Sequence, residues 1–295
     1  MAKSLRMVLS MTGFGRAEGM VGDRMFTVEL RALNSKQLDL LLKLPVACRE
    51  HDAGLRQWLG ERLVRGKVDL FINMAPSTGQ GGGRFDRQLL AAYYRELRAI
   101  VQEIDPEVRT DLFAHVLRMP EVHHEREEPV NSEQWTMVMA LVDSAVEAFN
   151  SFRRSEGERL ETDLRARCLV ILAALDRIAL HDAQRPDRVR ERLRRKVEEV
   201  RSEVDEARFE QEMLYYLEKF DITEEKVRLA GHCAHFEETL DGPAQQGRKL
   251  GFIAQEMGRE MNTIGAKAND ADLQRLVVEM KDELEKIKEQ VLNVL

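Results

Sequence analysis

The sequence predicts an α+β protein, with an N-terminal β-sheet-containing domain over residues 1–130 and a long, mainly helical region over residues 131–295. Up to about residue 74, hydrophobic residues recur at every second position, which is the period of a strand with one buried face. After residue 131 they recur at every third or fourth position, as in amphipathic helices, and strand-like patterns almost disappear. We therefore place the domain boundary near residue 130.

The N-terminal domain is predicted to contain both strands and helices. Phe26, Val28 and Leu30 alternate with more polar neighbours, whereas Leu55, Leu59 and Leu63 follow helical spacing. Arg65-Gly66-Lys67 has the composition of a turn that leads out of the second pattern. The predicted elements are strands over residues 26–33, 38–44 and 68–74 and helices over residues 49–64 and 86–104.

The C-terminal region is predicted to be a series of long amphipathic helices. Ser132, Glu133 and Gln134 provide the residue types that begin a helix. The predicted segments are residues 133–181, 185–220, 224–240, 248–264 and 272–295. Helices of this length usually bury their hydrophobic stripe against one another or against another subunit, so we expect a homo-oligomer.

Composition excludes several classes of protein. The chain has 45 Lys and Arg against 52 Asp and Glu, a formal net charge of -7, so it does not coat nucleic acid through bulk positive charge. No segment approaches the ~20 apolar residues that span a bilayer, and the N-terminus lacks the apolar run of a signal peptide, which predicts a cytoplasmic protein without a membrane partner. Three widely separated cysteines indicate neither a disulfide framework nor a thiolate zinc site.

Two glutamates stand one helical turn apart near the C-terminus. At about 100° per residue, Glu256 and Glu260 share a narrow face with Lys249, and Arg259 lies beside it. Like charges at this spacing repel, so a positive group is expected between them, either a metal ion or a cationic side chain. The simpler alternative is that Lys249 and Arg259 are those cations.

A second group of polar residues precedes this helix. Glu225 and His232 lie on one face of the segment 224–240, and a short loop containing Gly and Pro joins it to the next helix. Helices joined in this way tend to pack antiparallel, so Glu225, His232, Glu256 and Glu260 are predicted to face one another. Mixed oxygen and nitrogen ligands favour magnesium or manganese, and phosphodiester cleavage is a sensible use of such an ion. A structural histidine and an internal salt-bridge network remain the alternative.

Blocks at both ends of the chain make the sequence resemble the YicC/YloC family of bacterial proteins. The N-terminal blocks are Ser10 to Glu18, Val28 to Asp39, Leu44-Pro45 and Arg65 to Val68. The C-terminal blocks are Asp221 to Glu225, Arg228-Leu229, His232, Gly247 to Leu250, Gln255 to Met257, Arg259-Glu260, Asn262 to Gly265 and Lys281 to Asn293. Between residues 77 and 205 the resemblance is mainly one of helical character.

The resemblance implies an endoribonuclease that uses a divalent metal cation, manganese or magnesium, and forms a ring-like homo-oligomer, expected to be a hexamer, around RNA. Glu256, Glu260 and His232 are then the predicted catalytic residues, and Glu225, His232, Glu256 and Glu260 the predicted metal ligands. The predicted RNA-binding residues are Arg31, Asn34, Lys36, Arg65, Lys67, Arg228, Arg248, Lys249, Arg259 and Lys267. Because aromatic content is only 6%, recognition is expected to depend on backbone and shape, and hence on structured RNA.

Three positions depart from the family pattern. Gly251 stands where an acidic residue is usual, Gly258 where Asn is usual, and Ala266 where Ser is usual. Loss of the acidic group would weaken metal binding if that group is a ligand. Two other functions remain open: an RNA-binding adaptor that delivers transcripts to another nuclease, and a purely structural oligomer.

Overall fold

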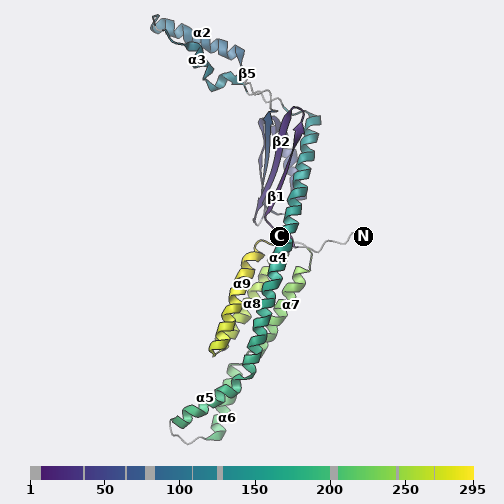
Figure 1. Cartoon of the computed structure of the whole chain (residues 1–295), viewed down its shortest axis with the longest axis vertical. Coiled ribbons are helices and arrows are strands. Elements are labelled where there is room, and N and C mark those ends of the chain that lie inside the picture. The colour runs from purple at the N-terminus through teal and green to yellow at the C-terminus, as the bar shows by residue number, and fades with distance from the viewer. Residues whose placement is uncertain are drawn as a thin grey trace, which may run out of the picture.

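A 52-residue helix, α4 (Ser132–Ala183), packs with its first half on a small β-sheet and with its second half in a helical bundle (Figure 1). The computed structural model describes residues 8–35, 37–63, 65–76, 84–107, 109–124, 129–199, 205–243, 246–268 and 270–295. The predicted α+β class is confirmed. Asn131 begins α4 with a capping box, because its side chain accepts from the Gln134 amide while the Gln134 side chain accepts from the Asn131 amide.

The sheet contains four strands in the order β1-β2-β4-β3, namely β1 (Gly13–Val21), β2 (Arg24–Leu33), β4 (Gly66–Pro76) and β3 (Leu38–Lys43). Strands β1, β2 and β4 are antiparallel neighbours, and β3 is parallel to β4. Parallel strands need a crossover, which the 3₁₀ helix η1 (Val46–His51) and the helix α1 (Asp52–Arg62) provide. The alternating residues Phe26, Val28 and Leu30 are buried, as their spacing predicts.

Strand β1 lies directly under α4 because two of its residues have no side chain. A Cβ atom on Gly15 would lie 2.1 Å from the Ala145 carbonyl oxygen and 2.6 Å from the Phe149 nitrogen. A Cβ on Gly13 would lie 2.4 Å from the Phe149 ring. Two glycines of the first sequence block therefore serve packing, since they allow the helix backbone to approach the strand.

The second core lies between four helices. Helices α7 (Thr223–Leu240), α8 (Gly247–Lys267) and α9 (Ala271–Val291) pack with the second half of α4. Their buried residues include Leu164, Ile171, Leu229, Phe236, Met257, Met261, Met280 and Ile287. None of the described helices is both long enough and apolar enough to cross a membrane.

A helical hairpin, α5 (Arg185–Glu199) and α6 (Glu206–Lys219), lies at the far end of α4 (Figure 1). The single segment predicted over residues 185–220 is thus two helices. Asp205 begins the second, because its carboxylate accepts from the amides of Ala207 and Arg208. Ion pairs Arg190–Glu210 and Arg194–Glu206 join the two helices.

A small module occupies the opposite end of the molecule (Figure 1). It contains β5 (Arg84–Phe85), α2 (Arg87–Ile104), α3 (Leu112–Leu117), the 3₁₀ helix η2 (Pro120–Val122) and β6 (His123–His124). Helix α2 closely matches the predicted range. It is strongly amphipathic, yet no residue with a described side chain in it is buried.

The two cores meet where the segment from Val8 to Thr12 crosses α4. Gly157 permits this crossing, because a Cβ there would lie 1.9 Å from the Val8 carbonyl oxygen. The Met11 amide donates to the Asn293 carbonyl at 2.8 Å, so the same segment is also bound to the residues that follow α9. The Arg153 guanidinium, 3% exposed, donates to the carbonyls of Met11 at 3.1 Å and Arg65 at 3.3 Å. Its burial lowers the pKa of Arg153 to about 10.

The contact of β1 with α4 predicts that Gly15→Ala is strongly destabilising. The added methyl group meets backbone atoms that cannot rotate away, so we expect a loss of about 3 kcal/mol in the free energy of unfolding. The control is Gly54→Ala on α1, where a Cβ meets nothing within 4 Å and a gain of about 0.5–1 kcal/mol is expected. Urea denaturation measures both. Equal stability of the Gly15 variant and the wild type would contradict the packing described.

Glu283 predicts a dependence of stability on pH. The Glu283 carboxylate on α9 accepts hydrogen bonds from Lys286 on the same helix and from Arg167 on α4, the latter at 3.0 Å. These contacts outweigh the effect of burial and lower the pKa of Glu283. A carboxyl with a lowered folded-state pKa adds stability above its unfolded pKa and loses it as pH falls through the folded value. The wild type should therefore lose stability as the pH falls below 4.5, the ordinary pKa of a glutamate, and the Glu283→Gln variant should lose less stability over the same range.

At neutral pH, Glu283→Gln should cost about 1–2 kcal/mol, measured by denaturation from pH 3 to 7. Glu279→Gln is the matched control, because it removes an exposed pair with Arg177 between the same two helices and such pairs contribute little. Parallel pH profiles for the Glu283 variant and the wild type would show that this contact does not stabilise the bundle.

Candidate nucleic-acid interface

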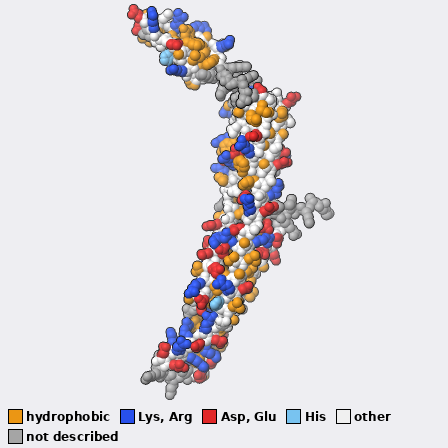
Figure 2. All heavy atoms as spheres, viewed as in Figure 1, with side chains coloured by type: hydrophobic (Ala, Val, Ile, Leu, Met, Phe, Trp, Pro, Cys, Tyr) orange, Lys and Arg blue, Asp and Glu red, His pale blue; other side chains and the backbone are white. Residues whose placement is uncertain are grey.

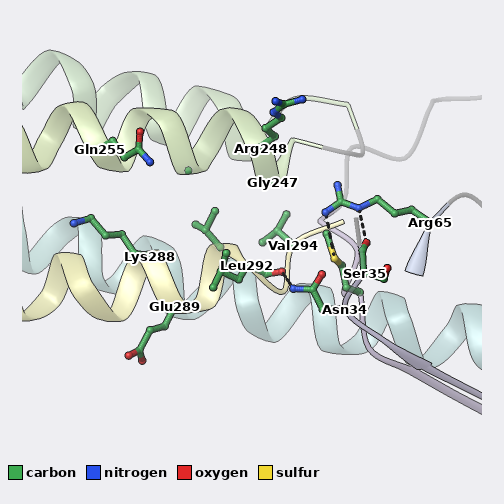
Figure 3. A pocket seen from close by; sticks show the side chains of 13 residues that line it. Asn34, Ser35, Arg65, Gly247, Arg248, Gln255, Lys288, Glu289, Leu292 and Val294 are labelled. Atoms are coloured by element: carbon green, nitrogen blue, oxygen red, sulfur yellow. Dashed lines mark hydrogen bonds between the residues drawn. The ribbon is translucent and has the colours of Figure 1, made fainter. Parts of the chain in front are cut away.

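A cavity of about 850 Å³ lies where the sheet meets the helical bundle (Figure 3). Five separate parts of the chain line it: the N-terminal segment, the residues that follow β2, the turn before β4, the beginning of α8, and the end of α9 with the residues after it. The lining residues are Met11, Asn34, Ser35, Arg65, Gly247, Arg248, Gly251, Gln255, Lys288, Glu289, Val291, Leu292 and Val294. Its volume falls in the range of sites for small ligands.

The sheet side of the cavity is held by hydrogen bonds to the backbone. Arg65 donates through Nε to the Ser35 carbonyl at 3.1 Å, and Asn34 donates through Nδ2 to the Leu292 carbonyl at 2.5 Å (Figure 3). Arg153 donates to the carbonyl of Arg65 itself. Because its backbone and its Nε are both fixed, the Arg65 guanidinium is held at the cavity.

The beginning of α8 supplies positive charge to the same cavity. Gly247 allows the helix to start against the C-terminal segment, since a Cβ there would lie 2.3 Å from the Val294 carbonyl oxygen. The amides of a first helical turn carry a partial positive charge that favours anions. Arg248 lines the cavity and Lys249 follows it in the sequence; the side chain of neither is paired with any described residue. Asn34, Arg65 and Arg248 therefore line one cavity together with the first turn of α8.

The predicted metal ligands have other partners within this chain. Glu225 is buried at 6% exposure and accepts from Lys267 at 2.8 Å, whereas Glu256 pairs with Arg259 at 2.8 Å. Lys267 near the end of α8 reaches Glu225 near the start of α7, so the helices are antiparallel, as predicted. Among the described residues, no group of three or more His, Cys, Asp and Glu side chains is placed to hold a metal ion.

The internal salt-bridge alternative therefore applies to Glu225 and Glu256. One oxygen of Glu225, Oε2, is buried without a partner among the described groups. Glu260 and His232 are half-buried, and their side chains make no hydrogen bond or ion pair with another described residue. Glu256 and Glu260 remain one turn apart on α8 and suit magnesium or manganese, which bind through one or two carboxylates together with water and phosphate.

The remaining predicted RNA-binding residues lie elsewhere. Arg31 is on the face of β2 away from α4, paired with Glu29 and 6.0 Å from the Phe71 ring centroid. Arg228 pairs with Glu224 on α7. Lys67 lies near the start of β4 between Leu33 of β2 and Asp39 of β3, with its side chain exposed, and Lys36 lies outside the described residues.

Sequence reasoning missed two groups at the cavity. Lys288 of α9 lines the cavity, and its ammonium group lies 2.7 Å from the Glu285 carboxylate. Arg153 of α4 holds Arg65 in place through a hydrogen bond to the Arg65 carbonyl. The spacing of Lys288 on an amphipathic helix resembles that of any solvated lysine, so no local signal separates it from its neighbours. Arg153 lies in the part of the chain where the family blocks are weakest.

One of the three departures from the family pattern lies at the cavity. Gly251 lines it, and a Cβ there would meet only Val291 Cγ1 at 3.8 Å, which is ordinary contact. Packing does not require this glycine, so an acidic side chain would fit at the cavity. Gly258 differs, since its Cβ would lie 3.2 Å from Leu284 on α9.

Comparison with known proteins gives a consistent result across the chain. Residues 8–162 match the model described as endoribonuclease YicC-like, N-terminal region, and residues 178–295 match endoribonuclease YicC-like, C-terminal. Two relatives are each named probable endoribonuclease YicC. The protein from Clostridioides difficile is 33% identical over 98% of this chain and 100% of its own length. The protein from Haemophilus influenzae is 29% identical over 98% of this chain and 100% of its own length. The chain therefore belongs to the YicC-like endoribonuclease family.

Proposed function

We propose that this protein is an endoribonuclease that binds structured or small RNA at the cavity and cleaves it with the help of a divalent metal ion. The observation that carries the proposal is the convergence of Asn34, Arg65 and Arg248 from distant parts of the chain onto the first turn of α8. The names of the two relatives support the reaction class. We place the activity in the cytoplasm.

Phosphate binding follows from the charges at the cavity. A guanidinium donates in a planar fork that matches phosphate oxygens, and the first amides of a helix add to the same field. The hydrogen bond from Arg65 to the Ser35 carbonyl already orients the Arg65 side chain. Phosphate binding therefore costs less conformational entropy than it would with a freely moving arginine. Contacts of this kind recognise backbone and shape, which favours structured RNA over a particular sequence.

The carboxylates of α8 are assigned to the metal ion. Glu256 and Glu260 would hold magnesium or manganese together with water and phosphate oxygens, whereas Glu225, bonded to Lys267, forms no metal-binding group with them among the described residues. Such an ion, when bound, favours hydroxide over water and neutralises charge on a phosphoryl oxygen. His232 would move a proton, because an imidazole nitrogen can both accept and donate one. Arg259, now paired with Glu256, would turn to the RNA phosphates.

We also propose that the protein acts as a homo-oligomeric ring, a hexamer, that encloses RNA. Support comes from the module at the end of the molecule, where Ile104 is 79% exposed and Phe113, Ile100 and Phe85 are also exposed. Figure 2 shows hydrophobic side chains gathered on this module. An amphipathic helix whose apolar face is only partly buried within one chain is stabilised when a second copy covers it.

An RNA-binding adaptor without chemistry of its own is the second candidate. The observation that favours it is that Glu225 and Glu256 are already neutralised by Lys267 and Arg259. In that case the carboxylates stabilise the bundle, and RNA binding does not require metal.

Cleavage of an end-labelled RNA hairpin by purified protein separates these candidates. We expect internal cuts with manganese or magnesium, none with EDTA, and none from the Glu256→Gln, Glu260→Gln double variant, which should still bind RNA. Arg248→Ala with Lys249→Ala should weaken binding and reduce the slope of log affinity against log salt by about 2. The control Arg275→Ala alters an exposed arginine of α9 and should change neither. Metal-independent binding without cuts would establish the adaptor.

The oligomer proposal predicts that Ile104→Glu dissociates the assembly. A charge on the apolar face of α2 must be desolvated on association, so the subunit equilibrium should shift by at least tenfold. Sedimentation velocity measures it. Ala99→Glu adds the same charge to an exposed position of that helix on its opposite face and should leave the mass unchanged. A wild-type monomer at all concentrations would rule out the ring.

A further inference from the structure

Helix α8 exposes an aromatic ring among its cations. Phe252 is 58% exposed, although its neighbours Leu250, Ile253 and Ala254 are buried in the second core. Its ring makes no ring–ring or cation–π contact with any described residue. An isolated exposed phenylalanine needs no explanation, but one surrounded by unpaired cations on a proposed RNA-binding helix does.

The helix places phosphate-binding groups one turn from this ring. Arg248 precedes Phe252 by four residues and Lys249 by three, spacings at which helical side chains are neighbours. Arg259, 74% exposed, lies about two turns further along the same exposed face. A base stacked on Phe252 would therefore hold its own phosphates beside Arg248 and Lys249, because only a sugar separates a base from its phosphates.

We propose that Phe252 is a binding residue that stacks on an unpaired RNA base while Arg248 and Lys249 hold the adjoining phosphates. This inference rests on the proposed function and gives it a substrate class: RNA with an unpaired nucleotide in a loop, bulge or end. Inside a duplex both faces of a base are covered by its neighbours, so an unpaired base offers the ring a face that the interior of a duplex does not. Because the chain contains few aromatic residues, we expect few stacking contacts with bases, and Phe252 would provide one of them.

Charge favours RNA over a second protein as the occupant. A protein surface that covered Phe252 would also desolvate Arg248 and Lys249, which have no carboxylate partner among the described residues. RNA supplies a π face and negative charge in one ligand. By contrast, the exposed Val278 of α9 lies next to Glu279 and Asp282, where a nucleic acid would be repelled.

The test compares four proteins on two RNAs by fluorescence anisotropy. The proteins are the wild type, Phe252→Ala, Phe252→Leu and Phe252→Trp, and the RNAs are a hairpin with an unpaired loop and a blunt duplex of equal length. We expect Ala and Leu to weaken hairpin binding about tenfold, Trp to restore it, and duplex binding to change less than twofold. Leu is the matched control, because it keeps apolar area and lacks a π face. Val278→Ala should behave as the wild type on both RNAs.

The thermal unfolding midpoint of each variant checks that the helical bundle is intact. Because Phe252 is exposed, we expect its replacement to leave this midpoint unchanged. Full binding by Phe252→Leu, or equal loss on hairpin and duplex, would overturn stacking while leaving the nuclease proposal in place. Lower mass of Phe252→Ala in sedimentation, without an RNA-specific loss, would assign the ring to a subunit contact instead. Failure of the wild type to bind either RNA with salt-dependent affinity would overturn the proposed function and this inference together.

Discussion

The Arg153 guanidinium joins the parts of the chain on which the candidate site depends. It lies in the middle of α4 and donates to the carbonyls of Met11 and Arg65, while its plane rests 4.4 Å from the Phe149 ring centroid. Burying a cation without a carboxylate is costly, and the lowered pKa expresses that cost. The carbonyls and the aromatic ring offset part of it. In return the N-terminal segment, the turn before β4 and the long helix are fixed together beside the cavity.

Local patterns in the sequence were sufficient to predict most helices and strands. Alternation identified β2 and β3, and helical spacing identified α4, α7, α8 and α9, because one face of each of these elements is more buried than the other. The break between α5 and α6 was not predicted, since charged residues continue across it. The cavity could not be predicted either: Asn34, Arg65, Arg248 and Lys288 are far apart in sequence and meet only through tertiary packing.

The ionic partners were also beyond the sequence. Lys249, Arg259 and Lys267 are all cations on α8, and spacing alone does not say which will neutralise a glutamate. Packing decides it, because the antiparallel arrangement brings Lys267 to Glu225 and leaves Lys249 in solvent. An acidic chain can in this way present local positive charge: cations such as Arg165 and Arg167 are paired with carboxylates, whereas Arg248 and Lys249 have no carboxylate partner among the described residues.

The length of α4 gives the molecule a mechanical property. At 1.5 Å per residue, the part of the helix beyond Gly157 is a rod of roughly 39 Å, so a bend of about 5° at that crossing would move its far end by roughly 3 Å. The cavity lies close to the pivot and the α5–α6 hairpin lies at the tip. Small rearrangements at the crossing would therefore be amplified at the periphery of the molecule.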